Sequence, residues 1–286
     1  MAFFVQNALG GLAYGGLLFM VAAGFTLIFG LMRVVNLAQT SFYLIGAYVG
    51  LALLGDHVNF WIAAVGAGLV VLVIGVVTYG GLLHRFHTKD LTTLLITLGV
   101  SLILDDAALA IWGGDPLSVP SPAHLTSSMT IGGAVFPVYW LALFGVAVLV
   151  GLALWFFQQR TRFGAIVRAG VDDEEMVRGL GVDVNRAFYV VFAIGAFLAG
   201  AGGLLGGPIT GVAPGLDGDL LALAFAVVIV GGMGSLSGAF IGSMLIGLVD
   251  TFGQALFPQL AYFTIFAPVA LIVALRPQGL LGRKEI

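Results

Sequence analysis

The chain has 286 residues, of which 60% are hydrophobic and 9% are charged, and its mean hydropathy is +1.12. Soluble domains carry about 25% charged residues, so this composition excludes an ordinary water-soluble fold and indicates that a lipid bilayer is the solvent. The net charge of −3 does not indicate a nucleic-acid partner, and the lack of cysteine excludes disulfides and thiolate metal sites.

Nine apolar segments follow one another along the chain, and each is a candidate membrane span. They cover residues 9–31, 37–54, 60–83, 91–112, 138–157, 187–205, 220–234, 239–256 and 261–275. The seventh is short for a perpendicular helix that rises about 1.5 Å per residue, so it is either tilted or broken and re-entrant. We therefore expect an all-α polytopic transmembrane helix bundle of about nine spans, within a range of eight to ten, and a single membrane domain over residues 1–286.

Glycine supplies 43 of the 286 residues, about twice its average usage. Small residues in membrane bundles let helix backbones approach closely and gain packing energy. The glycine-containing runs 195–200 and 238–242 are therefore predicted to be faces where helices touch.

All eleven Lys and Arg residues fall in loops on one side of the nine predicted spans. They are Arg33, Arg85, Lys89, Arg160, Arg162, Arg168, Arg178, Arg186, Arg276, Arg283 and Lys284. Short cytoplasmic loops collect Lys and Arg, so the N-terminus is predicted to be outside and the C-terminus cytoplasmic. The opposite loops carry Asp56, Asp115, Asp217 and Asp219 and have no basic residue.

Two of the loops are long. The outer loop, 113–137, contains four prolines and is predicted to form an extended, rigid surface segment. The inner loop, 158–186, is expected to contain a short helix at about 172–179. Asp172 would cap its start, with Glu175 three residues further on, and Gly179 or Gly181 would supply a left-handed residue at its end.

Motifs for catalysis or nucleotide binding are missing from the sequence. There is no GxxxxGK[ST] stretch to cradle phosphates, so the chain is not itself an ATPase. His84 and His87 are close together but lack a third metal ligand, and no GxSxG or HExxH motif occurs. We therefore expect no catalytic residue, no metal site and no cofactor in this chain, and we do not expect it to be an enzyme.

Polar residues inside the apolar segments form the candidate substrate path. They are Asn36, Gln39, Thr40, Thr93, Thr97, Ser101, Asp105 and Asp250. Residues 93, 97, 101 and 105 recur every four positions and so form a polar ridge on one helix face. The alternative interpretation is hydrogen bonding between helices, or to the helix's own backbone, and interfacial positions for Asp105 and its neighbour Asp106.

Several short stretches resemble the LivH-type permease subunits of branched-chain amino-acid ABC importers. The stretches, in chain order, are RVVNLAQ at 33–39, GAY at 46–48, LLITLG at 94–99, GLGV at 179–182, GGMGSLSGA at 231–239 and RPQGLLG at 276–282. Their order and spacing extend the resemblance over nearly the whole chain. Urea and short-amide permeases look similar, so the resemblance leaves the substrate open.

The resemblance implies an importer in a bacterial cytoplasmic (inner) membrane, in which this chain contacts membrane lipid and several protein partners. It implies two ATPase subunits that bind ATP and Mg, a second related permease in a hetero- or homodimer, and an extracytoplasmic substrate-binding protein. The inner-loop helix would contact the ATPase. Its residues are Asp172, Asp173, Glu174, Glu175, Met176, Val177, Arg178, Gly179, Leu180 and Gly181. The acidic run at 172–175 departs from what the family leads one to expect.

A secondary transporter driven by an ion gradient and acting alone is the alternative from another class. Such a carrier is expected to hold clear pairs of ionisable residues in mid-membrane, and the sequence shows none. The charged inner loop also fits a docking surface better than a gate.

Overall fold

The computed structural model describes residues 2–55, 58–86, 90–131, 133–172 and 174–282. Eleven α-helices make up most of these residues. They are α1 Ala2–Met32, α2 Gln39–Gly55, α3 Phe60–Gly81, α4 Asp90–Trp112, α5 Val138–Arg160, α6 Arg162–Asp172, α7 Glu174–Gly179, α8 Val184–Thr210, α9 Leu216–Gly231, α10 Leu236–Leu256 and α11 Ala261–Leu275. Each of the nine predicted apolar segments is largely α-helical, so the expected helical membrane bundle is confirmed.

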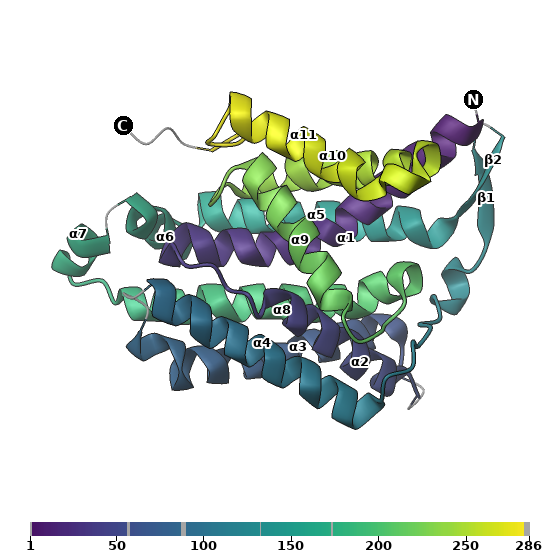
Figure 1. The fold of residues 1–286 in the computed structure, drawn as a ribbon. Helices are drawn as coiled ribbons and strands as arrows, with labels where there is room; N and C mark the ends of the chain where they lie inside the picture. Colours follow the sequence, from purple (N-terminus) through teal and green to yellow (C-terminus); the bar gives the residue numbers. More distant parts are fainter. Residues whose placement is uncertain (1, 56–57, 87–89, 132, 173, 283–286) are drawn as a thin grey trace.

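Six of these helices are long and apolar enough to cross a membrane by length and composition: α1, α3, α4, α5, α8 and α10. The helices α2 and α11 are apolar but shorter. The helix α9 has 16 residues, about 24 Å, and Figure 1 shows it crossing the bundle diagonally. It begins at Leu216, four residues before the predicted segment, and ends at Gly231.

The structure adds elements that the sequence patterns did not predict. The outer loop contains a hairpin in which β1 (Ser128–Ile131) pairs antiparallel with β2 (Ala134–Pro137). The inner loop contains α6 ahead of α7. The apolar residues Phe163, Ile166 and Val167 recur at helical spacing in α6, and that periodicity is the signal for this helix.

The helices α1 and α8 form the centre of the bundle. From Gly10 to Ile28 nearly every residue of α1 is buried, and α8 is buried in the same way beyond Gly195. A helix buried on all sides has no reason to be amphipathic, which explains its uniform hydrophobicity. By contrast α3, α4 and α5 have exposed apolar faces, including Ile62 and Leu91, which suit contact with lipid.

Glycines set the close approach of the central helices. A Cβ placed on Gly46 of α2 would collide with the backbone of Gly200 of α8. A Cβ on Gly238 of α10 would collide with Gly231 of α9, and one on Gly242 would lie 2.7 Å from the Val227 oxygen. The prediction that runs 195–200 and 238–242 are helix contact faces is therefore confirmed.

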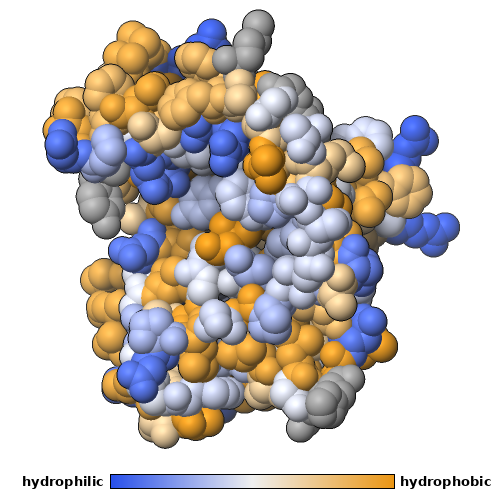
Figure 2. Space-filling view, turned by 90° about the vertical axis from the view of Figure 1, so that its right-hand side faces the viewer, coloured by the Kyte–Doolittle hydropathy of each residue, from blue (hydrophilic) through white to orange (hydrophobic). Residues whose placement is uncertain are grey.

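The two ends of the bundle differ. The helices α6 and α7 and the C-terminal end lie at one end, and the N-terminus and the β1–β2 hairpin lie at the other (Figure 1). Figure 2 looks onto the hairpin end, where weakly polar side chains cover much of the centre and both hydrophobic and strongly hydrophilic ones lie around the edges.

Candidate functional site

The helix α2 begins inside the bundle and not at the end of α1. The Gln39 side chain donates from Nε2 to the carbonyl oxygen of Gly195, 2.9 Å away in α8. A Cβ on Gly24 of α1 would collide with the same amide group. Gly24 lies eight positions before Met32, which is about 12 Å along the helix. The connection 33–38 therefore runs back into the bundle beside α1, as Figure 1 shows.

Non-helical backbone at membrane depth is tolerated where protein buries it and satisfies its hydrogen bonds. Asn36, which is 1% exposed, accepts from the Ala38 amide at 3.2 Å through Oδ1. The Leu37 amide donates to Thr97 Oγ1, also at 3.2 Å. These contacts favour the hydrogen-bonding interpretation: Asn36 and Thr97 bond to the backbone of the connection, and Gln39 bonds to the backbone of α8.

Four other polar residues meet where α2, α4 and α9 come together, and we call them the polar junction: Ser41, Ser101, Asp105 and Asp217. The hydroxyl oxygens of Ser41 and Ser101 are 2.7 Å apart. Ser41 Oγ also donates to Asp217 Oδ2 at 3.2 Å. The Asp105 carboxyl group, one helical turn beyond Ser101 in α4, lies near enough to Asp217 to interact with it electrostatically. Ser41, Ser101 and Asp217 are all buried.

The polar junction places two carboxyl groups together in apolar surroundings. None of α2, α4 and α9 contains Lys, Arg or His that could neutralise them. Two carboxylates this close repel each other unless a proton or a cation lies between them. One oxygen of Asp105, Oδ1, is buried without a hydrogen-bond partner among the described residues.

The remaining predicted path residues lie elsewhere. Thr93 donates to the Phe86 carbonyl at 2.8 Å. Asp250 of α10 is 4% exposed and accepts from Gln254 Nε2 at 2.8 Å. Thr40 is buried, and its hydroxyl has no hydrogen-bond partner among the described residues. Of the eight predicted residues, the structure therefore brings only Ser101 and Asp105 into the junction.

Ser41 and Asp217 were missed by the sequence patterns. Ser41 follows the predicted path residue Thr40, but no periodic pattern singled it out. Asp217 was assigned to an outer loop because it precedes an apolar run, whereas it lies in the first turn of α9. Acidic residues favour the first turn of a helix, so Asp217 and Asp219 after Gly215 were the available signal for an earlier start.

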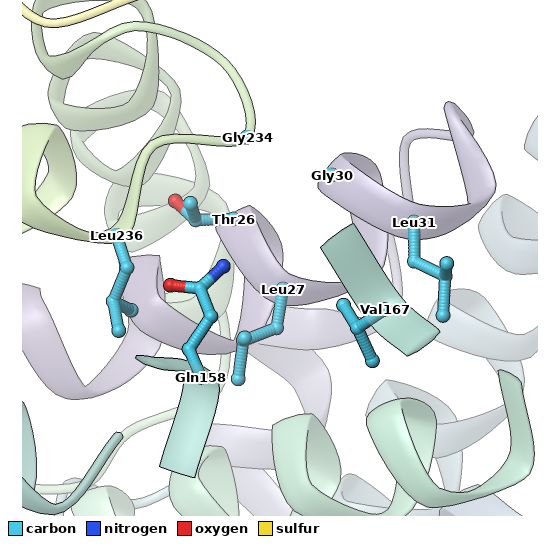
Figure 3. A pocket seen from close by; sticks show the side chains of 8 residues that line it. All are labelled: Thr26, Leu27, Gly30, Leu31, Gln158, Val167, Gly234 and Leu236. Carbon is cyan, nitrogen blue, oxygen red and sulfur yellow. The ribbon is translucent and has the colours of Figure 1, made fainter. Parts of the chain in front are cut away.

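Two cavities lie away from the polar junction. Figure 3 shows the first, of about 10 Å³, between α1, α5, α6 and the α9–α10 connection. Thr26, Gln158 and Gly234 contribute to its wall, and its volume suits a single water molecule. The second, of about 270 Å³, is a surface hollow beside Asn59 and Pro120. Neither is lined by residues of the junction.

The predicted coupling helix is shorter than expected. Asp172 is the last residue of α6, and α7 covers Glu174–Gly179. The helical periodicity of α6 carries the chain to Asp172 and so displaces the predicted cap. Asp173 lies outside the described residues. Gly181 has the left-handed φ of 79° that was predicted for the end of the segment.

The side chains of the α7 region point in different directions. Val177 is 5% exposed and packs inward. Met176 and Leu180 are 65% and 77% exposed. An exposed pair of large apolar residues in the long loop 158–186 suits contact with a protein partner.

The fold and the polar junction define a multi-pass helical membrane protein with a hydrogen-bonded polar centre. A family model described as "Branched-chain amino acid transport system / permease component" matches residues 7–275. The chain belongs to this family and is a permease component, not an enzyme.

Characterised relatives match over nearly the same extent. The branched-chain amino acid permease BraD of Pseudomonas aeruginosa is 29% identical, with 99% of this chain and 97% of BraD covered. LivH of Escherichia coli is 28% identical over the same shares of both chains. The ribose import permease RbsC of Escherichia coli is 24% identical and covers 88% of this chain and 79% of its own length. The resemblance to LivH-type permeases is thereby confirmed.

Proposed function

We propose that this chain is the membrane-spanning permease subunit of an ATP-driven importer for branched-chain or related amino acids. The observation that carries the proposal is similarity over the full length: 99% of the chain aligns with BraD and LivH, whose names give branched-chain amino acids as the substrate. The ribose permease matches with lower identity and coverage. Amino acids are therefore favoured over sugars, and none of these relatives favours urea or an ion-coupled carrier.

The importer would contain partners that supply energy and substrate. We expect two ATPase subunits holding ATP and Mg, a second related permease in a hetero- or homodimer, and an extracytoplasmic binding protein. The exposed Met176 and Leu180 of the α7 region support a docking surface for the ATPase. The coupling segment would extend over Asp172–Gly181.

We place this permease in a bacterial cytoplasmic membrane with nine crossings, the N-terminus outside and the C-terminus inside. The positions of Arg160 and Arg168 near α6, at the end of the bundle opposite the N-terminus, support this orientation. The basic residues Lys89, Arg283 and Lys284 and the acidic Asp56 belong to the same prediction and lie outside the described residues.

Reconstitution tests the proposal. Proteoliposomes holding the permease and its ATPases, with binding protein and labelled leucine outside, are expected to accumulate leucine only when ATP is present on the ATPase side. The control is the permease alone under a proton or sodium gradient, where no accumulation is expected. Uphill uptake by the permease alone would replace the importer with the secondary-carrier alternative.

A further inference from the structure

The helices α1, α3, α8 and α10 pack closely against one another at glycines. A Cβ on Gly11 of α1 would lie 2.8 Å from the Leu248 Cα of α10. A Cβ on Gly200 of α8 would lie 2.6 Å from Val71 of α3. Contacts this close leave no room for one helix to slide past another without repacking. A Cβ on Gly24 of α1 would lie 2.9 Å from the Gly195 oxygen of α8, so close contacts join α1, α3, α8 and α10 into one rigid body.

The outer half of α9 is held differently. A Cβ on Gly215 or Gly218 would meet no atom within 4 Å. The apolar contacts of Leu220, which is 1% exposed, have no directional geometry. The side chain of Asp217, in the first turn of α9, makes a contact with defined geometry, the hydrogen bond that it accepts from Ser41. This half of α9 is thus held by a side-chain bond and not by interlocked backbones.

The inner end of α9 is fixed in place. Gly231 packs directly on Gly238 of α10. The amides of Leu280 and Leu281 donate to the carbonyl oxygens of Val230 and Gly231, at 2.8 and 3.1 Å. We call these two bonds the tail clasp. They satisfy carbonyl groups that the end of a helix otherwise leaves unpaired.

The ends of α9 are flanked by glycines with left-handed backbone, Gly215 with φ 88° and Gly232 with φ 99°. Such positions absorb changes of direction at low steric cost. Before Gly215, the residues Val212 and Leu117 exchange two main-chain hydrogen bonds of 2.8 and 2.9 Å. Main-chain bonds therefore connect the α9 region to the outer loop on one side and to the C-terminal tail on the other.

We propose that α9 is the moving gate of the translocation path: it pivots at its clasped inner end, and the Ser41–Asp217 hydrogen bond is the latch that holds its outer half closed. The inference rests on the proposed function, in which ATP hydrolysis by the partner subunits drives the movement of α9. A pivot there separates α9 from α2 and α4, so it opens the polar junction to water while the rigid body stays intact. Asp217 is then a positioning residue for α9.

Two pairs of aromatic rings on α1 offer a matched test of this motion. Phe25 contacts Phe225 of α9 with ring centroids 5.3 Å apart, and Phe19 contacts Phe240 of α10 at 5.1 Å. The chain has no natural cysteine, so Phe25→Cys/Phe225→Cys and Phe19→Cys/Phe240→Cys can each be joined by a short, reducible bifunctional thiol reagent. Leucine uptake is measured in the reconstituted complex before joining, after joining and after reduction.

Joining α1 to α9 is expected to lower uptake about tenfold or more, with recovery on reduction, because gating motions can limit turnover. Joining α1 to α10 is expected to leave uptake within about twofold of the untreated sample, because those helices do not move apart. Full uptake with α1 joined to α9, or equal inhibition by both pairs, would overturn the gate. Failure of the proposed function would give a different result from failure of the gate, because the unmodified complex would then show no ATP-dependent uptake at all.

A second measurement replaces glycines instead of phenylalanines, so it leaves no cavity in the core. Gly218→Cys in α9 and the control Gly145→Cys in α5 both place a side chain where a Cβ meets nothing within 4 Å. Each carries an environment-sensitive fluorophore in the full complex, with ADP or with trapped ATP. The emission is expected to shift between the two states at 218 and to stay constant at 145. An unchanged emission at 218 would show that α9 stays in place and would contradict the proposal.

Discussion

The side-chain amide of Gln39 donates to the carbonyl oxygen of Gly195 in space that exists only because residue 24 has no side chain. Three segments far apart in the sequence meet at this contact: α1, the start of α2 and the middle of α8. It fixes the depth at which α2 begins and therefore the position of Ser41, two residues later.

Gly24→Ala is expected to destabilise the protein by about 1–3 kcal/mol, because the methyl group overlaps the Gln39 amide and forces the helices apart. Thermal unfolding of the purified protein in detergent measures the effect. Gly99→Ala in α4 is the control, since a Cβ there meets nothing within 4 Å. Equal melting temperatures for both variants would contradict the packing described at Gly24.

Asp217→Ala removes the acceptor of the Ser41 hydrogen bond, whereas Asp217→Asn keeps an oxygen that can accept it. A hydrogen bond to a charged group contributes about 1.5–3 kcal/mol, so Asp217→Ala is expected to shift the closed state towards the open one. The expected result is more ATP hydrolysed per leucine transported. Asp217→Asn is expected to restore most of the wild-type ratio, and equal ratios for both variants would rule out the latch.

Val177→Pro breaks the centre of α7, at a cost of about 3 kcal/mol to the helix. We expect ATPase association or the coupling of hydrolysis to uptake to be lost, while the membrane spans remain inserted. Glu174→Pro is a matched control, because proline is tolerated at the first position of a helix. Co-purification with the ATPase and uptake at equal membrane abundance are the measurements. Normal values for Val177→Pro would remove α7 from the coupling path.

Single cysteines test the orientation. Arg168→Cys lies in α6 at the inner end, and Pro120→Cys lies in the outer loop beside the second cavity. An impermeant thiol reagent applied to intact cells is expected to label position 120 and not position 168. Opening the cells is expected to expose position 168. The reverse pattern would invert the proposed topology.

The sequence predicted the helices of the bundle well because hydrophobic length is a local property. Each of the nine segments is largely helical, and the glycine runs 195–200 and 238–242 are contact faces. The errors came at helix ends. Asp217 and Asp219 were assigned to a loop, and Asp172 was assigned as a cap, because polar residues beside an apolar run fit either side of a boundary.

Half of the polar junction was predictable and half was not. The four-residue spacing of Thr97, Ser101 and Asp105 fixed the polar face of α4 from local geometry alone. Ser41 and Asp217 are 176 positions apart, and the contact between them depends on the depth of α2 and the tilt of α9. No local pattern encodes either quantity, so their pairing appears only in the fold.

The tail clasp also has a consequence for how the protein is made. The carbonyl groups of Val230 and Gly231 are synthesised about fifty residues before the amides of Leu280 and Leu281 that pair with them. During translation α9 therefore enters the membrane with its inner end unpaired, and it stays so until α10 and α11 have followed. Synthesis of residues 280–281 is then the step that completes the inner end of α9, and a nascent chain halted after α11 would hold the helices α1 to α11 without the two bonds of the tail clasp.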